Sequence, residues 1–257
     1  MRAPILLTFL LAATNAFGAE KLVEPIASDV KLKPSEKALK HKLTWNASHD
    51  VPLTVVLGAG WIATELNKPG IAPAACRWCS TNALDRGVTR AVGVQNTAIP
   101  ATLTDVTAFG VMPLATLGTL SVLAYNEDRF DETPVNALIM LQSLAFAGAL
   151  NQSVKFLAGR ERPFVAELTG SEKRGTREPA DNNLSFYSGH TGSAFALAVS
   201  AGTIAHLRGY ENEAVVWAVG LPIAAAVGYG RIAAKKHYLS DVLVGAGLSG
   251  ALGFAVP

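Results

Sequence analysis

Residues 155–163 read Lys-Phe-Leu-Ala-Gly-Arg-Glu-Arg-Pro, residues 188–190 read Ser-Gly-His, and Arg231, His237 and Asp241 follow further along the chain. Each of these three segments borders an apolar stretch of helical length. Together they contribute several cations, two imidazoles and a carboxylate. The pattern predicts helices whose ends bring these distant segments together at one site.

The basic residues suit the binding of a phosphate group. Lys155, Arg162 and Arg231 can neutralise its non-bridging oxygens, and arginine offers a forked pair of donors for them. Ser188 and Gly189 stand just before an apolar helix, so the serine hydroxyl and backbone N–H groups can face the same oxygens. A helix N-terminus is a ready anion site because its first N–H groups lack intrahelical partners.

The two histidines suit the hydrolysis of a phosphate. His237 and Asp241 are four residues apart, so a helical turn would place them on one face. A carboxylate bonded to one ring nitrogen fixes the tautomer and leaves the other nitrogen free as a nucleophile. His190, at the start of a different helix, is the candidate acid for the leaving group. The segments thus predict a phosphatase with His237 as its nucleophile.

In this order, Lys-x6-Arg-Pro, Ser-Gly-His and Arg-x5-His-x3-Asp resemble the three signature motifs of the type 2 phosphatidic acid phosphatase (PAP2) superfamily. The resemblance covers residues 155–241, and the helix pattern matches as far as the C-terminus. It implies that His237 forms a phosphohistidine, that His190 protonates the leaving group, and that Asp241 orients His237. It also implies hydrolysis without a metal or other cofactor. The residues that it assigns to phosphate binding are Lys155, Arg162, Ser188, Gly189 and Arg231.

Two positions depart from the family pattern. Tyr187 stands where the family usually has proline, which changes the stiffness of that loop. Gly230 stands where it usually has serine, which removes one possible hydroxyl donor. Three further cations inside the motifs have no family role, and we interpret them as raising the local positive potential or contacting lipid headgroups. They are Arg160, Lys235 and Lys236.

The rest of the chain predicts an all-α helical bundle of about five to six apolar helices that span a membrane. Strand-like alternation is weak throughout, and small residues recur that let helices approach closely. Pro113 predicts a kink, and residues 51–66 predict an interfacial or buried helix for which a full span is doubtful. The five longer apolar stretches are 103–125, 135–157, 189–207, 214–232 and 241–256.

The composition favours a membrane protein. Half of the residues are hydrophobic and 16% are charged, against roughly 25% charged in typical soluble domains. The net charge of +2 gives no indication of a nucleic-acid partner. Two segments read as irregular, residues 67–100 and the polar residues 164–188, and we expect the second to border the site.

The N-terminus reads as a signal peptide over residues 1–18, and an uncleaved membrane anchor is the alternative. In an exported chain, Cys76 and Cys79 favour a local disulfide over a metal or redox site. The predicted organisation continues with an N-terminal part over 19–100, which holds the short apolar helix and the cysteine loop. A phosphatase core over 101–257 follows.

These observations predict an integral membrane phosphatase of a bacterial-type inner membrane, with a lipid phosphate or diphosphate as its substrate. Two alternatives stay open: a soluble periplasmic acid phosphatase of the class A type in the same superfamily, and a non-catalytic protein that binds lipid phosphates. The orientation depends on residues 51–66. If the signal is cleaved and this stretch does not cross the membrane, the site faces the periplasm, which we favour; if it crosses, the site faces the cytoplasm. The headgroup and the oligomeric state are not predicted.

Overall fold

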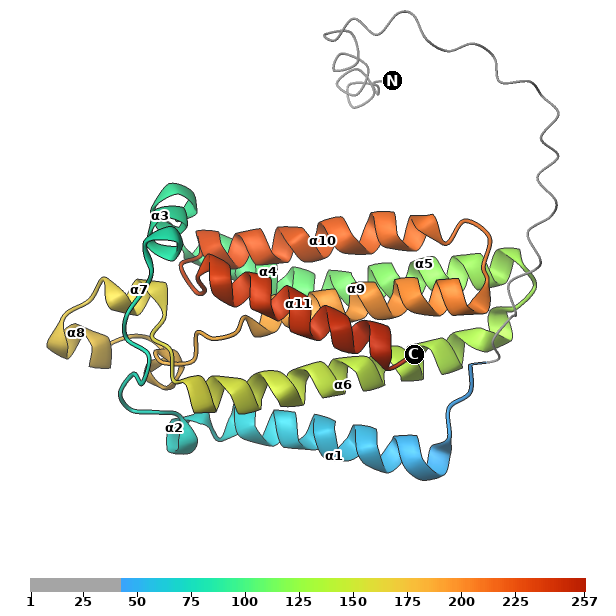
Figure 1. The fold of residues 1–257 in the computed structure, drawn as a ribbon, viewed down its shortest axis with the longest axis horizontal. Coiled ribbons are helices and arrows are strands. Elements are labelled where there is room, and N and C mark those ends of the chain that lie inside the picture. The colour runs from blue at the N-terminus through green and yellow to red at the C-terminus, as the bar shows by residue number, and fades with distance from the viewer. Residues whose placement is uncertain (1–42) are drawn as a thin grey trace, which may run out of the picture. The chain divides into compact units, whose positions relative to one another are not determined.

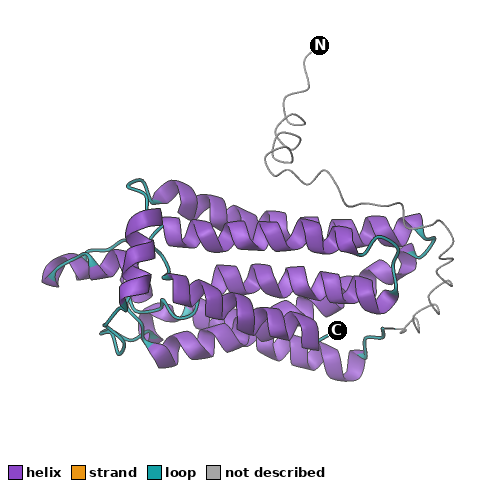
Figure 2. Ribbon diagram, turned by 45° about the horizontal axis from the view of Figure 1, so that its top comes forward, coloured by secondary structure: helices purple, strands orange, loops and turns teal. Residues whose placement is uncertain are grey.

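The computed structural model describes residues 43–257, so the predicted signal peptide lies outside the described residues. Within this range every regular element is a helix, and the long helices lie side by side (Figure 2). The same range holds one isolated bridge, between Trp78 and Arg160. The prediction of an all-α bundle is confirmed.

Six long helices form the bundle (Figure 1), and the second of them consists of α4 and α5 joined by a π-helical turn, η1. Successive long helices run in opposite directions. The end of the bundle that holds residues 67–97, 159–188 and 234–238 is called the head end here, and the opposite end the tail end. The bounds are α1 Ala47–Leu66, α4 Ala98–Val106, η1 Thr107–Val111, α5 Met112–Asn126, α6 Thr133–Ala158, α9 Gly189–Arg208, α10 Ala214–Ala233 and α11 Leu239–Ala255.

Short helices gather at the head end (Figure 1). The prediction that residues 67–100 are irregular is wrong in part, because α2 and α3 form there and α4 begins there. The Asn82 side chain accepts a hydrogen bond from the Asp85 backbone N–H at 2.8 Å and so caps α3. Helices this short leave little periodic signal in a sequence. The bounds at this end are α2 Lys68–Ile71, α3 Ala83–Val92, α7 Pro163–Ala166, α8 Gly170–Arg174 and the 3-10 turn η3 Pro179–Asp181. The other 3-10 turn, η2 Phe130–Glu132, lies at the tail end between α5 and α6.

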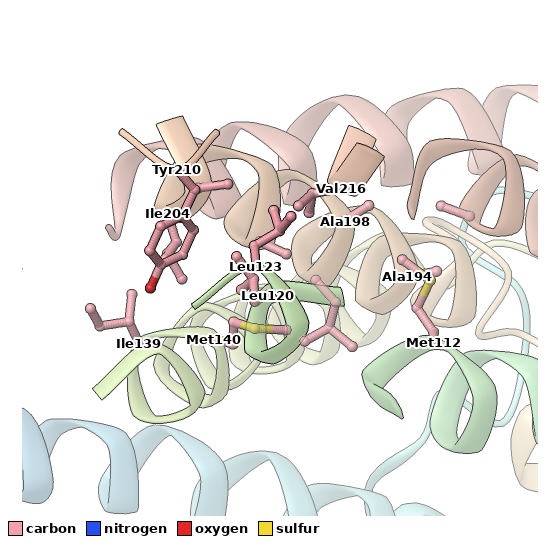
Figure 3. Close-up of a cluster of buried hydrophobic side chains, with 14 of the residues drawn as sticks. Met112, Leu120, Leu123, Ile139, Met140, Ala194, Ala198, Ile204, Tyr210 and Val216 are labelled. Atoms are coloured by element: carbon pink, nitrogen blue, oxygen red, sulfur yellow. The ribbon is translucent and has the colours of Figure 1, made fainter. Parts of the chain in front are cut away.

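The apolar core lies between α5, α6, α9 and α10. Figure 3 shows Leu120, Met140 and Ile204, from three of these helices, within one cluster of buried side chains. Most residues of α9 are buried, and small residues bring its neighbours close. A Cβ added at Gly253 of α11 would lie 2.5 Å from the Ala196 carbonyl oxygen of α9. The surrounding helices therefore hold α9 in place over its whole length.

Helix α1 lies beside α6 and runs in the same direction. Gln142 Nε2 donates to Asp50 at 3.4 Å near the tail end, and the Trp61 ring packs on Gly148 nearer the head end. The described residues form one compact unit, and the predicted boundary at residue 100 lies inside α4. Residues 43–100 thus pack directly on the helices that carry the motifs.

The outer surface of the bundle is apolar. Leu114 of α5 is 76% exposed and Leu157 of α6 is 73% exposed, and large exposed apolar surfaces mark sites of membrane or protein contact. Helix α1 lies beside the part of α6 between Gln142 and Gln152. The stretches that are long and apolar enough to cross a membrane are Ala98–Asn126, Phe130–Ala158 and Ala214–Ala233.

We expect Gly148→Ala to destabilise the protein and Gly58→Ala to leave its stability unchanged or slightly higher. A Cβ at residue 148 would lie 2.3 Å from the Trp61 ring, whereas a Cβ at residue 58 would lie 4.0 Å from the Ala145 Cβ. Overpacking costs about 1–3 kcal/mol, and Gly→Ala inside a helix gains up to about 1 kcal/mol. Thermal unfolding in detergent measures both variants. Equal midpoints would contradict the close approach of α1 to α6.

Candidate active site

The first motif lies where α6 ends at the head end. Lys155 is in the last turn of this helix, and Gly159 ends it in the left-handed conformation, with φ of 52°. The chain then turns, so Arg162 immediately precedes α7. Arg162 donates from Nε to the Asp181 carbonyl at 2.8 Å and from Nη2 to the Asp181 carboxylate at 3.0 Å. The polar segment 164–188 therefore borders this arginine.

The second motif forms the start of α9. Ser188 is the N-cap, and its Oγ accepts from the Thr191 N–H at 3.4 Å and bonds the Thr191 hydroxyl at 2.9 Å. A Cβ at Gly189 would lie 2.7 Å from Asn151 Oδ1 and 3.2 Å from Lys155 Nζ. Glycine at this position thus allows the lysine ammonium to lie beside the first N–H groups of the helix, which have no intrahelical partner. The two motifs meet here.

The third motif begins at the end of α10 with Arg231, which is buried. Its Nη1 donates to Asp105 at 2.9 Å and to the Thr104 hydroxyl at 3.3 Å. The family departure at Gly230 has a physical reason, because a Cβ there would lie 2.4 Å from Thr104 Cγ2. Glycine therefore lets α4 approach α10, and Thr104 supplies a hydroxyl next to the arginine.

Asp105 is a site residue that the motifs did not indicate. Its carboxylate lies 2.7 Å from His190 Nε2 and also accepts from Arg231. The His190 ring packs edge-on against Phe109, with centroids 4.9 Å apart. Phe109 belongs to η1, the π-helical turn just before Pro113; such turns are frequent at functional sites. One signal could have found Asp105, namely a lone acid inside an apolar stretch of spanning length.

The nucleophile candidate is held differently from the prediction. His237 is 1% exposed, and its Nδ1 lies 2.7 Å from the Ser185 carbonyl oxygen. A carbonyl only accepts, so Nδ1 carries the proton and Nε2 holds the free lone pair. Asp241 lies 3.8 Å from Nδ1, beyond hydrogen-bond distance. It instead accepts from the Tyr238 N–H at 2.8 Å and from the Ser185 hydroxyl at 2.6 Å.

This difference follows from the position of Asp241 in α11. His237 precedes the N-cap Tyr238, so it is not on the helix, whereas Asp241 is the third helical residue and bonds the N-cap N–H. The predicted helical turn that would have placed the two side chains on one face does not exist. Asp241 therefore reaches His237 through Ser185, which bonds both residues.

The electrostatic surroundings keep His237 neutral. Burial is the largest cause, and the guanidinium groups of Arg162 and Arg231 add to it, so the pKa of His237 lies well below its usual 6.5. A neutral imidazole with Nδ1 protonated has a nucleophilic Nε2 at neutral pH. Burial is the largest single influence on the pKa of Asp181 and acts to raise it. The nearby cations Arg162 and Lys68 together outweigh burial, so the pKa of Asp181 is lowered.

The interpretation of Arg160 as raising the local positive potential or contacting lipid headgroups is wrong. Its side chain is 1% exposed and pairs with Asp85 at 2.8 Å and with Asp241. The two neighbouring lysines behave differently: Lys235 pairs with Glu167 at 2.9 Å, and the Lys236 ammonium lies 4.8 Å from the centroid of a phenylalanine ring. The family resemblance gave no sign that one of these three cations is internal.

A cavity of about 290 Å³ adjoins the motifs. Its polar wall contains Lys155, Gly189 and His190. Helix α1 and η1 contribute the apolar side chains of Trp61, Ile62, Leu66 and Phe109, together with the carboxylate of Glu65. A larger cavity of about 1220 Å³ lies between residues 65–76 and the segment 161–183, and Asp181 lines it. The site thus has an apolar side and a polar side.

Four segments therefore converge at the head end: the three motifs and the start of the α4–η1–α5 helix. A sequence profile of the PAP2 superfamily matches residues 136–257. This part of the chain belongs to the PAP2 superfamily. All three motifs fall inside the PAP2 region, whereas Asp105, Asp85 and the cysteines precede it.

Among solved structures, the chain is similar to the first transmembrane PAP2-type phosphatidylglycerolphosphate phosphatase from Bacillus subtilis. The two share 20% sequence identity over 80% of this chain and 93% of that one, with a TM-score of 0.47. No curated protein sequence matches the chain.

Proposed function

We propose that the protein is a membrane phosphatase that hydrolyses a lipid phosphate or diphosphate through a phosphohistidine at His237. One observation carries the proposal. The cavity of about 290 Å³ that contains Lys155, Gly189 and His190 is closed on its other side by the apolar residues of α1 and η1. A lipid phosphate has the matching chemistry, a phosphate joined to an apolar chain.

In this mechanism the phosphate oxygens bind to Lys155, Arg162, Arg231 and the first N–H groups of α9. Ser188 contributes by capping α9 and so aiming those N–H groups, since its hydroxyl is bonded to Thr191. Arginine and helix N-termini are suited to this because they offer preorganised donors. The carboxylates now paired with the arginines, Asp105 and Asp181, must give up part of that contact to the substrate.

The chemical step then takes place between two histidines. His237 Nε2 attacks phosphorus, the bond from phosphorus to the leaving oxygen breaks, and that oxygen takes a proton from His190. Water next attacks the phosphohistidine while His190 removes its proton, which releases inorganic phosphate. Asp105 bonds His190 at 2.7 Å and so holds its imidazole in place. Asp241 supports His237 through Ser185.

The exposed apolar surface supports an integral membrane protein rather than the soluble periplasmic alternative. Three stretches have the length and composition of membrane spans, and their outward residues are exposed and apolar. Sodium carbonate washing separates the two alternatives, since a soluble enzyme would leave the membrane pellet and an integral one would stay.

The orientation rests on two observations that point in opposite directions. A disulfide joins Cys76 and Cys79 at the head end, and disulfides persist in oxidising compartments. Helix α1 lies beside α6 from the Asp50–Gln142 contact to the Glu65–Gln152 contact. If α1 crosses the membrane, a cleaved signal would place the head end in the cytoplasm. We give the disulfide more weight because it lies beside the site, and we propose a periplasmic site at the inner membrane.

Alkaline phosphatase fusions test this orientation. The reporter is joined after Asp128, in the turn at the tail end, or after Gly175, in the loop at the head end. Because this reporter is active only outside the cytoplasm, we expect activity from the fusion at 175 and none from that at 128. Activity at 128 alone would overturn the periplasmic orientation.

Purified protein in detergent tests the activity itself. We expect phosphate release from at least one of phosphatidate, phosphatidylglycerophosphate, a polyprenyl diphosphate and lipid A, with the same rate in the presence of EDTA. Binding of these lipids without any phosphate release would instead favour the non-catalytic alternative. Loss of activity with EDTA would contradict hydrolysis by protein side chains alone.

A further inference from the structure

A buried cluster of three charges lies beneath the nucleophile candidate. The Arg160 guanidinium donates from Nη2 to Asp85 at 2.8 Å and from Nη1 to Asp241 and to the Ser240 hydroxyl, the latter at 2.8 Å. The side chains of the arginine and both aspartates are at most 1% exposed. Asp85 also accepts from the Ser240 N–H at 2.9 Å. The arginine thus ties α3 to the first turn of α11.

Two aromatic rings hold the guanidinium plane. The Trp78 ring lies 4.1 Å from its carbon and the Tyr238 ring lies 4.4 Å from it, distances at which a cation and a ring attract. Trp78 sits between Cys76 and Cys79 of the disulfide loop, and its backbone bonds Gly159 and Glu161 on either side of Arg160. Residues 76–85 therefore enclose the arginine from outside the PAP2 region.

A short series of hydrogen bonds leads from this cluster to His237. The Asp241 carboxylate accepts from the Ser185 hydroxyl at 2.6 Å, and the Ser185 N–H donates to the Arg160 carbonyl at 2.9 Å. The Ser185 carbonyl accepts from His237 Nδ1 at 2.7 Å. All three polar groups of Ser185 are therefore hydrogen-bonded. The N–H is bonded to Arg160 and the hydroxyl to Asp241, while the carbonyl fixes the His237 imidazole.

We propose that Arg160, clamped between Asp85 and Asp241, is a positioning residue that sets the orientation of the His237 imidazole through Ser185. The proposal rests on the proposed role of His237 as nucleophile. It extends the catalytic unit to Asp85, which lies 75 residues before Arg160 in the chain. The arginine itself touches neither the phosphate-binding donors nor the cavity, so its effect falls on the attack and not on substrate binding.

The chain offers a matched control at the tail end. Arg208 is as buried as Arg160, at 3% exposed, and it donates to Asn136 at 3.0 Å and pairs with Glu132 at 3.4 Å. A loss of folding stability alone would affect both arginine variants in the same way. Only Arg160 is connected to His237.

The test compares Arg160→Met and Arg208→Met with the wild-type protein and His237→Gln, all purified in detergent, with phosphatidate as substrate and rates expressed per folded molecule. For Arg160→Met we expect kcat to fall by about 100-fold, the loss that small misplacements of a reacting group cause, with KM within about threefold. Arg208→Met should keep kcat within about twofold of wild type. If Arg160→Met does not fold, Asp85→Asn is compared with Glu132→Gln, and we expect the kcat of Asp85→Asn alone to fall, by about 10-fold.

The outcomes separate the two proposals. Equal losses of kcat in the head-end and tail-end variants, or a change in KM alone in Arg160→Met, would overturn the positioning role. The proposed function would remain intact in that case if the wild-type protein is active and His237→Gln is inactive. A wild-type protein without phosphatase activity, or an active His237→Gln, would overturn the proposed function and the positioning role with it.

Discussion

Replacing His237 with glutamine should lower kcat for a lipid phosphate by at least about 10⁴-fold, the scale seen when a covalent nucleophile is removed. His237 is the imidazole whose Nδ1 is bonded to a carbonyl, which leaves Nε2 unprotonated. Its lowered pKa keeps it neutral at physiological pH. Glutamine retains the size and a hydrogen-bond donor but has no nucleophilic nitrogen.

The measurement is phosphate release with phosphatidate over a range of enzyme concentrations, together with inhibition by inorganic phosphate. His206→Gln is the control, since His206 is 69% exposed and pairs with Glu213 near the tail end. We expect the control to match wild type and His237→Gln to keep phosphate binding while losing turnover. A His237→Gln enzyme as active as the control would end the nucleophile assignment.

The second large effect is expected at Arg231. Arg231→Met should lower kcat/KM by about 10²–10³-fold, the usual cost of losing one preorganised donor that stabilises charge in the transition state. Arg231→Lys should recover only part of this loss, because lysine keeps the charge but not the fork of donors. The side chain is buried and donates to Asp105, so methionine at this position removes a guanidinium that is already held in place.

Arg129→Met serves as the control for this variant, because Arg129 lies at the tail end in ion pairs with Glu127 and Glu132. Competitive inhibition by inorganic phosphate is measured beside kcat/KM for each variant. We expect inhibition to weaken in Arg231→Met and to stay unchanged in Arg129→Met. Wild-type inhibition and wild-type kcat/KM in Arg231→Met would exclude this arginine from the phosphate site.

The helix ends at the site could be predicted because their signals are local. Lys155 lies in the last turn of α6, Ser188 caps α9, and Arg231 lies in the last turn of α10, each where an apolar stretch meets a polar break. The motif residues also appear in short, recognisable spacings. Fold class and most of the candidate site therefore follow from patterns that each lie within one continuous segment of the chain.

The residues that escaped prediction act across long separations in the chain. Asp105 contacts Arg231 at a distance of 126 residues, and Asp85 contacts Arg160 at a distance of 75. No spacing rule links such pairs in a single sequence. Asp241 shows a different difficulty, because a carboxylate four residues after a histidine can bond it or can cap its own helix. In this protein the capping position and Arg160 take the carboxylate, and Ser185 bonds the histidine.

We propose that three distant motifs hold a phosphate against Nε2 of His237. In the most direct test, the enzyme reacts with ³²P-labelled phosphatidate and the reaction is stopped rapidly without acid. The labelled protein is then isolated and the labelled residue is identified. We predict that wild-type protein carries a label that is stable in base and lost in acid, as a phosphorus–nitrogen bond requires. The label should map to His237 and should be missing in His237→Gln. Turnover by the wild-type enzyme with no labelled protein, or with a label on another residue, would exclude a phosphohistidine at His237.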